Sequence, residues 1–382
     1  MGAATTNDRV SFSEVEFDAP PDVRAMLAQL GRTEDVRFAP GGRRLAIACY
    51  ERNSIAVADV TVAGHRSITV ERVEEHRSDA LREPHGVDFV DEDTIVVANR
   101  GSGIVAFRFG DGGSLVPLGA LGDDVRHVPQ VAGSVAVLAG KPPQILVCDN
   151  RASVVARYRL DAGSITGGDV VVSRWLDLPD GLSVSADERW LAVSSHDTHT
   201  VVIHSLESHT AADPVAVLRG VRYPHGVRFF GEDRYLVVAD AGAPCVHVFT
   251  RPHGGWRGAG YPTFSLRVMG DARFADGHHN VQEGGPKGVD VHAATEVLVA
   301  TYEQQPLAFF DLGAAVDAGA DAPTPDALLE YELHVLERFA DAKDAARAQV
   351  AALEGTMLFR AAAPARRAYA TVRGLVSRND RR

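Results

Sequence analysis

Several absences narrow the classes of protein that this sequence could encode. No run approaches the roughly 18 consecutive apolar residues of a membrane span, and residues 1–8 lack the basic and apolar segments of a secretory signal. The chain has only three cysteines, Cys49, Cys148 and Cys245, each within or beside an apolar stretch. An odd number of cysteines in such settings indicates buried thiols in a reducing compartment rather than a disulfide framework. We therefore expect a cytoplasmic protein.

The sequence also lacks the motifs of several common enzyme classes. It contains no Gly-x-Ser-x-Gly, no P-loop, no dinucleotide-binding glycine fingerprint and no Cys-x-x-Cys. No nucleotide cofactor is therefore expected, although hydrolysis stays open. The net charge is −12 even though residues 360–382 are rich in arginine, so the rest of the chain is more acidic still. An acidic body argues against nucleic acid as a partner.

What the sequence does contain is a repeated phrase, Pro-x-Gly followed by an apolar residue. Each copy continues through a charged turn into a second apolar stretch, as in residues 94–99 and 235–240, and then into a third. Weaker copies begin near residues 34 and 135. Aligned on Gly86, the repeats fall close to the roughly 40–50 residues of a propeller blade. The phrase stands at residues 84–87, 179–182, 224–227 and 286–289, and the aligned positions are 35, 86, 136, 181, 226 and 288.

These repeats predict an all-β, six-bladed propeller over residues 10–315, with seven blades left open. Residues 10–17 alternate apolar and polar, which predicts a strand that completes the last blade and closes the ring. From Pro325 the apolar period changes to that of a helix, so residues 325–382 are predicted to form a helical extension with a basic end. Three roles stay open for it: packing on the propeller, pairing with a second copy, and contact of residues 355–382 with a membrane surface or protein.

The starts of the repeats also place charged side chains together. In a propeller the first strand of each blade is innermost, so the residues just before the aligned positions should converge on the channel. Two imidazoles and two carboxylates suit one divalent metal ion, and a lysine could anchor an anion; alternatively, each side chain caps its own strand. The converging residues are Glu34, His85, Val135, Asp180, His225 and Lys287, of which Glu34, His85, Asp180 and His225 are the predicted metal ligands.

A second set of candidates follows the second strand of each repeat. Asparagine and aspartate at these positions, such as Asn99, are expected to bond the following turn. The larger side chains are candidates for the channel rim. We expect substrate binding by Tyr50, His196, Tyr302 and Glu303, and catalytic roles for Arg100, His85, Asp180, His225 and Lys287.

Residues 223–227, Tyr-Pro-His-Gly-Val, and the following 233–240 resemble a blade of the YVTN/NHL-type propellers, closest to the lactonase group. Residues 84–100 are similar. The related gluconolactonase and regucalcin-like hydrolases hold one divalent metal at the channel with a glutamate, asparagines and an aspartate. That resemblance implies metal-binding roles for Glu34 and Asp180, whereas His85 and His225 stand where asparagines would be expected. The departure argues against calcium.

Residues 353–367 resemble the C-terminal tails of bacterial glycosyltransferases from glycan-assembly clusters, with Phe359 in place of a tryptophan. Together the resemblances imply an enzyme acting on a small, carbohydrate-derived substrate in the channel, by lactone hydrolysis or a related lyase or isomerase step. The alternative is a non-catalytic scaffold in a glycan or natural-product pathway, which recruits partners or membrane through its C-terminal helices.

Overall fold

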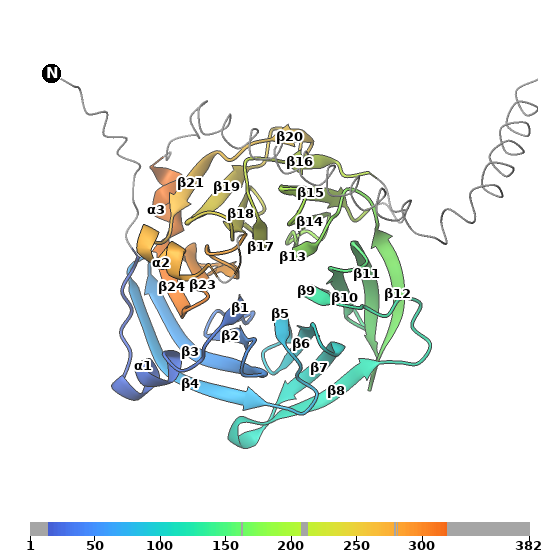
Figure 1. Cartoon of the computed structure of the whole chain (residues 1–382), viewed down its shortest axis with the longest axis horizontal. Helices are drawn as coiled ribbons and strands as arrows, with labels where there is room; N and C mark the ends of the chain where they lie inside the picture. Colours follow the sequence, from blue (N-terminus) through green and yellow to red (C-terminus); the bar gives the residue numbers. More distant parts are fainter. Residues whose placement is uncertain (1–13, 162, 208–212, 279, 281, 319–382) are drawn as a thin grey trace, which may run out of the picture. The chain divides into compact units, whose positions relative to one another are not determined.

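Most of the described chain is β-strand, and consecutive strands form antiparallel sheets around a common centre (Figure 1). The computed structural model describes residues 14–161, 163–207, 213–278, 280 and 282–318. They belong to one compact unit, residues 1–325, and a second unit comprises residues 326–382. The predicted helical extension, residues 325–382, lies outside the described residues. The arrangement of the described strands is consistent with a β-propeller.

Within each group of strands, chain order runs from the centre outwards, so the first strand is the innermost. Alternating apolar residues and tight polar turns give each group its antiparallel meander. The groups are β1 (Thr33–Phe38), β2 (Arg44–Cys49), β3 (Ser54–Gly64) and β4 (Ser67–Arg77); β5 (Pro84–Asp91), β6 (Thr94–Asn99), β7 (Gly103–Phe109) and β8 (Leu115–Leu121); and β9 (Ala132–Leu138), β10 (Gln144–Asp149), β11 (Val154–Asp161) and β12 (Ser164–Val172). They continue as β13 (Pro179–Val184), β14 (Trp190–Ser195), β15 (Thr200–Ser205) and β16 (Ala216–Leu218); β17 (Pro224–Phe230), β18 (Tyr235–Asp240), β19 (Cys245–Thr250), β20 (Gly258–Gly260) and β21 (Phe264–Arg267); and β22 (Val289–Val291), β23 (Val297–Tyr302) and β24 (Gln305–Asp311).

Two parallel contacts join neighbouring groups at their outer edges. β8 pairs with β12 through Ala120 opposite Ser164, which merges two groups into one eight-stranded sheet. The short β20, which belongs in sequence to the following group, pairs with β16. Outer strands that find partners in this way leave fewer unpaired sheet edges.

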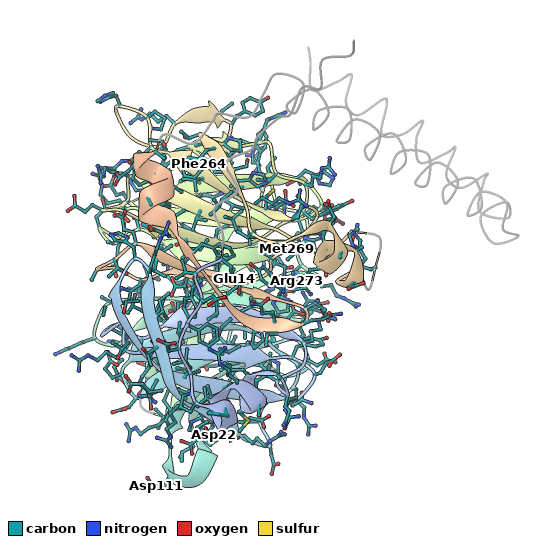
Figure 2. All side chains as sticks on the ribbon, turned by 90° about the vertical axis from the view of Figure 1, so that its left-hand side faces the viewer. Glu14, Asp22, Asp111, Phe264, Met269 and Arg273 are labelled. Carbon is teal, nitrogen blue, oxygen red and sulfur yellow. The ribbon has the colours of Figure 1, made fainter. Side chains whose placement is uncertain are left out.

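The N-terminal segment pairs with the outer strand of the last group, where a closing strand was predicted. Val15 forms an isolated antiparallel bridge with Phe309 of β24, and its amide donates to the Phe309 carbonyl at 2.7 Å. The Asp18 amide then donates to the Ile68 carbonyl of β4 at 2.9 Å. Residues 14–18 therefore link β24 to β4. The side view shows Glu14 near Arg273, with which it forms an ion pair (Figure 2).

The register corrects one alignment. Val97 lies opposite Val87 in the β5–β6 pair, and Val147 lies opposite Val135 in the β9–β10 pair. Val135 therefore corresponds to Val87, and the residue that matches His85 is Gly133. The aligned position predicted at Ala136 was two residues too late, because this repeat lacks the Pro-x-Gly phrase.

The hydrophobic core is divided among the interfaces between adjacent groups of strands. One cluster joins Ile55 and Val57 of β3 to Val87 and Ile95, for example. All three cysteines are buried, as predicted.

The three α-helices of the described residues are short. They are α1 (Pro21–Leu27), α2 (Asp271–Asp276) and α3 (Leu312–Asp317). Among the described residues, no helix has the length and apolar character needed to cross a membrane.

Candidate functional site

Close contact between inner strands brings the candidate side chains together. A Cβ atom on Gly181 would overlap the carbonyl oxygen of His225, and one on Gly226 would lie 2.6 Å from the carbonyl oxygen of Lys287. Only glycine permits backbones to approach this closely. The glycine of each Pro-x-Gly phrase therefore lets the preceding residues meet around the channel.

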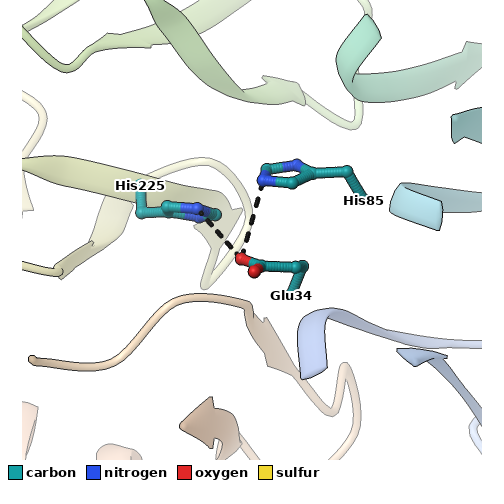
Figure 3. A group of neighbouring side chains, drawn as sticks. All are labelled: Glu34, His85 and His225. Atoms are coloured by element: carbon teal, nitrogen blue, oxygen red, sulfur yellow. Dashed lines mark ion pairs between the residues drawn. The ribbon is translucent and has the colours of Figure 1, made fainter. Parts of the chain in front are cut away.

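Glu34, His85 and His225 form the centre of the site (Figure 3). The Nε2 atoms of both imidazoles lie 3.6 Å from Glu34 Oε2. The side chain of Glu34 is fully buried, and those of the two histidines are 2% and 4% exposed. Glu34 Oε2 accepts no hydrogen bond from the described residues. A buried carboxylate oxygen without a donor is unusual and calls for a ligand or ion.

Asp180 is the second carboxylate of this centre. Its Oδ2 lies 3.3 Å from His225 Nε2 and accepts no hydrogen bond among the described residues. Its Oδ1 accepts hydrogen bonds from Asn150 Nδ2 at 2.9 Å and Arg100 Nη2 at 3.2 Å. Burial would raise the pKa of Asp180, but neighbouring groups, first His225 and also Arg100, hold that pKa well below its ordinary value.

The hydrogen bonds of His85 identify its tautomer. Nδ1 lies 2.7 Å from the Gly133 carbonyl, to which it must donate, so Nε2 carries the lone pair. Arg100 Nη2 donates to that lone pair at 2.8 Å. Burial, reinforced by Arg100, lowers the pKa of His85 to about 3. His85 is thus a neutral imidazole with Nε2 turned towards the two carboxylates, the state that binds metals.

Cationic side chains surround the carboxylates. Lys287 Nζ lies 3.1 Å from Glu34 Oε1, 3.4 Å from Glu283 Oε2 and 3.3 Å from Glu303 Oε2. Arg32 is ion-paired with Glu34 and lies 3.6 Å from Glu303. Burial opposes ionisation of Glu34, but Lys287 is the strongest of several neighbours that lower its pKa. The carboxylate is therefore held ionised.

The remaining predicted residues are divided between the site and the core. Tyr50 lies beneath the Arg32 guanidinium, 4.6 Å from ring centre to Cζ, and its ring centre is 6.5 Å from that of His85. His196 and Glu303 also face the site. Tyr302 lies in a hydrophobic cluster, and its hydroxyl donates to the Val268 carbonyl at 3.0 Å.

Three further residues complete the site: Arg32, Asn150 and Glu283. The side chain of Asn150 occupies the space beside Gly133, where other repeats carry a large side chain. Asn150 was expected only to bond its turn, whereas Arg32 and Glu283 stand outside the repeat positions. A charged residue directly before a strand start is a sequence signal that could have found Arg32.

A second layer of buried charges adjoins this site on the same inner strands. Arg37 Nε lies 3.2 Å from Asp88 Oδ1, and Arg228 Nε lies 3.3 Å from Asp290 Oδ1. The carboxylates of this layer also accept hydrogen bonds from backbone amides of the neighbouring inner strand, which gives the layer a structural role. Val87 donates to Asp35 at 3.1 Å, Val137 to Asp88 at 2.7 Å and Phe38 to Asp290 at 2.7 Å.

The central donors fit a divalent transition metal. Ligands about 2.0–2.2 Å from a four-coordinate zinc ion lie roughly 3.3–3.6 Å apart, and His225 Nε2 lies at such distances from Glu34 Oε2 and from Asp180 Oδ2. The candidate ligands would be Glu34, His85, Asp180 and His225. Imidazole ligands favour zinc or iron over calcium, which prefers oxygen. Arg100 would have to release His85 Nε2, and its side chain is 27% exposed on the open side.

No protein-family model and no curated protein sequence matches the chain. Its fold is similar to a calcium structure of a carbohydrate-active enzyme of family AA12 from Trichoderma reesei, with a TM-score of 0.53 and 12% identity over 74% of this chain and 93% of that one. It is also similar to the holo pyranose dehydrogenase PQQ domain from Coprinopsis cinerea, with a TM-score of 0.52 and 14% identity over the same shares. At this identity the likeness shows the fold alone.

Proposed function

We propose that the chain is a six-bladed, lactonase-like propeller enzyme that acts on a small, carbohydrate-derived substrate in the channel with one divalent transition metal. The reaction proposed first is lactone hydrolysis, and a lyase or isomerase step on the same substrate class would use the same groups. One observation carries the proposal: Glu34 Oε2 and Asp180 Oδ2 are buried, accept no hydrogen bond among the described residues, and both face His225 Nε2 at 3.6 and 3.3 Å.

The charge of the site supports a cation. Among the described residues in the ion-pair network, four carboxylates lie against three cationic side chains, which leaves one negative charge before the histidines are counted. Such a surplus in a buried site favours a divalent ion over none. The carboxylates are Glu34, Asp180, Glu283 and Glu303, and the cations are Arg32, Arg100 and Lys287.

A metal held by Glu34, His85, Asp180 and His225 would polarise a carbonyl and would lower the pKa of a bound water molecule. The chain's own groups bind and orient the substrate. Arg32 and Arg100 are 25% and 27% exposed, whereas Glu34 and Asp180 are almost completely buried. The two most exposed side chains of this ion-pair network are therefore cationic, and they suit a carboxylate or a polarised carbonyl oxygen. Lys287 balances negative charge that develops near Glu34.

The names of the structural neighbours agree with a carbohydrate-related substrate, since both refer to enzymes of sugar chemistry. The calcium and quinone cofactor in those names belong to those proteins. We further propose that the chain is cytoplasmic and that residues 325–382 serve partner or membrane contact.

A pH-stat assay with a panel of aldonolactones tests the proposal. Metal-loaded protein should hydrolyse at least one lactone above the background rate, and Glu34→Gln should lower that rate at least about 100-fold. Glu71→Gln, which changes an exposed carboxylate that accepts a hydrogen bond from Thr61, should leave the rate unchanged. Background rates with every lactone, or equal rates in Glu34→Gln, would contradict lactone hydrolysis at this site.

A further inference from the structure

His196 is a buried imidazole beside the candidate metal site, and its nitrogens lack hydrogen bonds among the described residues. It follows β14, its exposure is 1%, and neither Nδ1 nor Nε2 makes a hydrogen bond to any described residue. Leaving a buried polar atom without a hydrogen bond destabilises the folded protein. A feature with this cost calls for an occupant that supplies the missing contact.

Two carboxylates complete a set of donors around His196. Its Nε2 lies 3.8 Å from Glu283 Oε1, while the other oxygen of Glu283 faces Lys287. Asp180 is the third member, and one donor atom from each of the three residues lies within 4.8 Å of the others. Glu283 is 19% exposed, so the group opens towards solvent on that side.

Packing alone does not account for an imidazole at this position. The His196 ring lies against Tyr223, with ring centres 4.9 Å apart and planes at 35°. A phenyl ring would make the same contact without burying two unpaired nitrogens. The nitrogens are therefore the part of the side chain that needs an explanation.

We propose that Asp180, His196 and Glu283 hold a second divalent cation beside the first, with Asp180 as the carboxylate shared by both. This inference rests on the proposed function, because the first cation would be held by Glu34, His85, Asp180 and His225. One imidazole and two carboxylates form a donor set suited to zinc, manganese or iron, with positions left open for substrate. Shared carboxylates are typical of two-metal hydrolytic sites.

The charge of the site predicts which of the two cations binds more tightly. The first enters a network with one surplus negative charge, and the second enters the same network after that charge has been reversed. Repulsion between neighbouring cations in a buried site is strong. The second cation should therefore bind at least about tenfold more weakly than the first.

Titration of the chelator-treated full chain with Mn²⁺, followed by electron paramagnetic resonance, tests the inference. Wild type should bind two equivalents, and the spectrum at saturation should show exchange coupling between two close ions. His196→Phe keeps the packing against Tyr223 and should bind only one equivalent, without coupling. His196→Gln is the second variant, and His76→Ala, a buried histidine on β4, is the matched control that should still bind two.

The outcomes separate this inference from the proposed function. One uncoupled equivalent in wild type, or two equivalents in both His196 variants, overturns the second site and leaves the first intact. No bound Mn²⁺ in wild type, repeated with Zn²⁺, overturns both. Circular dichroism of each variant shows that a lost equivalent reflects lost ligands rather than unfolding.

Discussion

The imidazole rings of His85 and His225 lie 5.2 Å apart, centre to centre, although they come from widely separated repeats of the chain. Both belong to Pro-His-Gly phrases, and both turn Nε2 towards the same oxygen of Glu34. The same phrase therefore orients both imidazoles in the same way, and the ring of inner strands brings them together around Glu34.

Gly181→Ala should destabilise the fold and disturb the site. The new methyl group would overlap the His225 carbonyl, so β13 and β17 would have to separate. Overpacking of this kind costs about 1–3 kcal/mol or more. Thermal unfolding should show a clear fall in Tm. Gly64→Ala, where no heavy atom lies within 4 Å of the added carbon, should unfold almost as wild type does; an equal fall in both variants would contradict the close contact.

The residues of the site that occupy repeat positions could be predicted from the sequence. The repeated Pro-x-Gly phrase led to Glu34, His85, Asp180, His225 and Lys287, because a repeat places equivalent residues at equivalent points of a ring.

The sequence could not locate the residues that reach the site from elsewhere. Asn150 fills the space left by Gly133, and Glu283 comes from the long interval before β22. Tyr302 occupies a repeat position, but its side chain lies in the core. The sequence could not predict this, because the repeat does not specify which face of β23 the side chain is on.

Lys287→Met should make stability depend on divalent cations. The substitution removes the ammonium group shared by three carboxylates, those of Glu34, Glu283 and Glu303. Removing one partner of a buried ion pair costs about 3–5 kcal/mol. Urea unfolding in EDTA should show this loss, and added Mn²⁺ should recover part of it. If Lys287→Met in EDTA were as stable as wild type, the lysine would not be offsetting the negative charge of the carboxylates.

The free energy of unfolding should depend on pH through Glu75. Arg52 forms two hydrogen bonds to this carboxylate and is the main cause that lowers the pKa of Glu75 to about 2 from 4.5. Because the folded pKa is depressed, the contribution is complete above pH 4.5 and is lost as pH falls towards 2. Arg52 and Arg77 are 36% and 54% exposed, so we expect about 1 kcal/mol at neutral pH.

Urea unfolding of wild type and Glu75→Gln at pH 6 and pH 3 measures this contribution. The difference between the two proteins should be smaller at pH 3. A difference that is the same at both pH values would show that the ion pair contributes nothing that depends on ionisation.

The three thiols should be inert in the folded protein. Burial raises the pKa of Cys49 to about 12 and that of Cys148 well above its ordinary value. Since the thiolate is the reactive form, a thiol reagent such as DTNB should label none of them in buffer and all three in guanidinium chloride. Rapid labelling of one cysteine in the native protein would indicate local opening of its strand.

The central claim is that the converging side chains bind a metal, and elemental analysis of the purified protein tests it most directly. Wild type reconstituted with Zn²⁺ or Mn²⁺ and then dialysed should retain at least the equivalent held by the first site, because the first cation enters a negatively charged site. The His85→Ala, His225→Ala double variant should lose that equivalent, and His76→Ala should keep it. No metal in wild type, or equal metal in the double variant, would contradict the account.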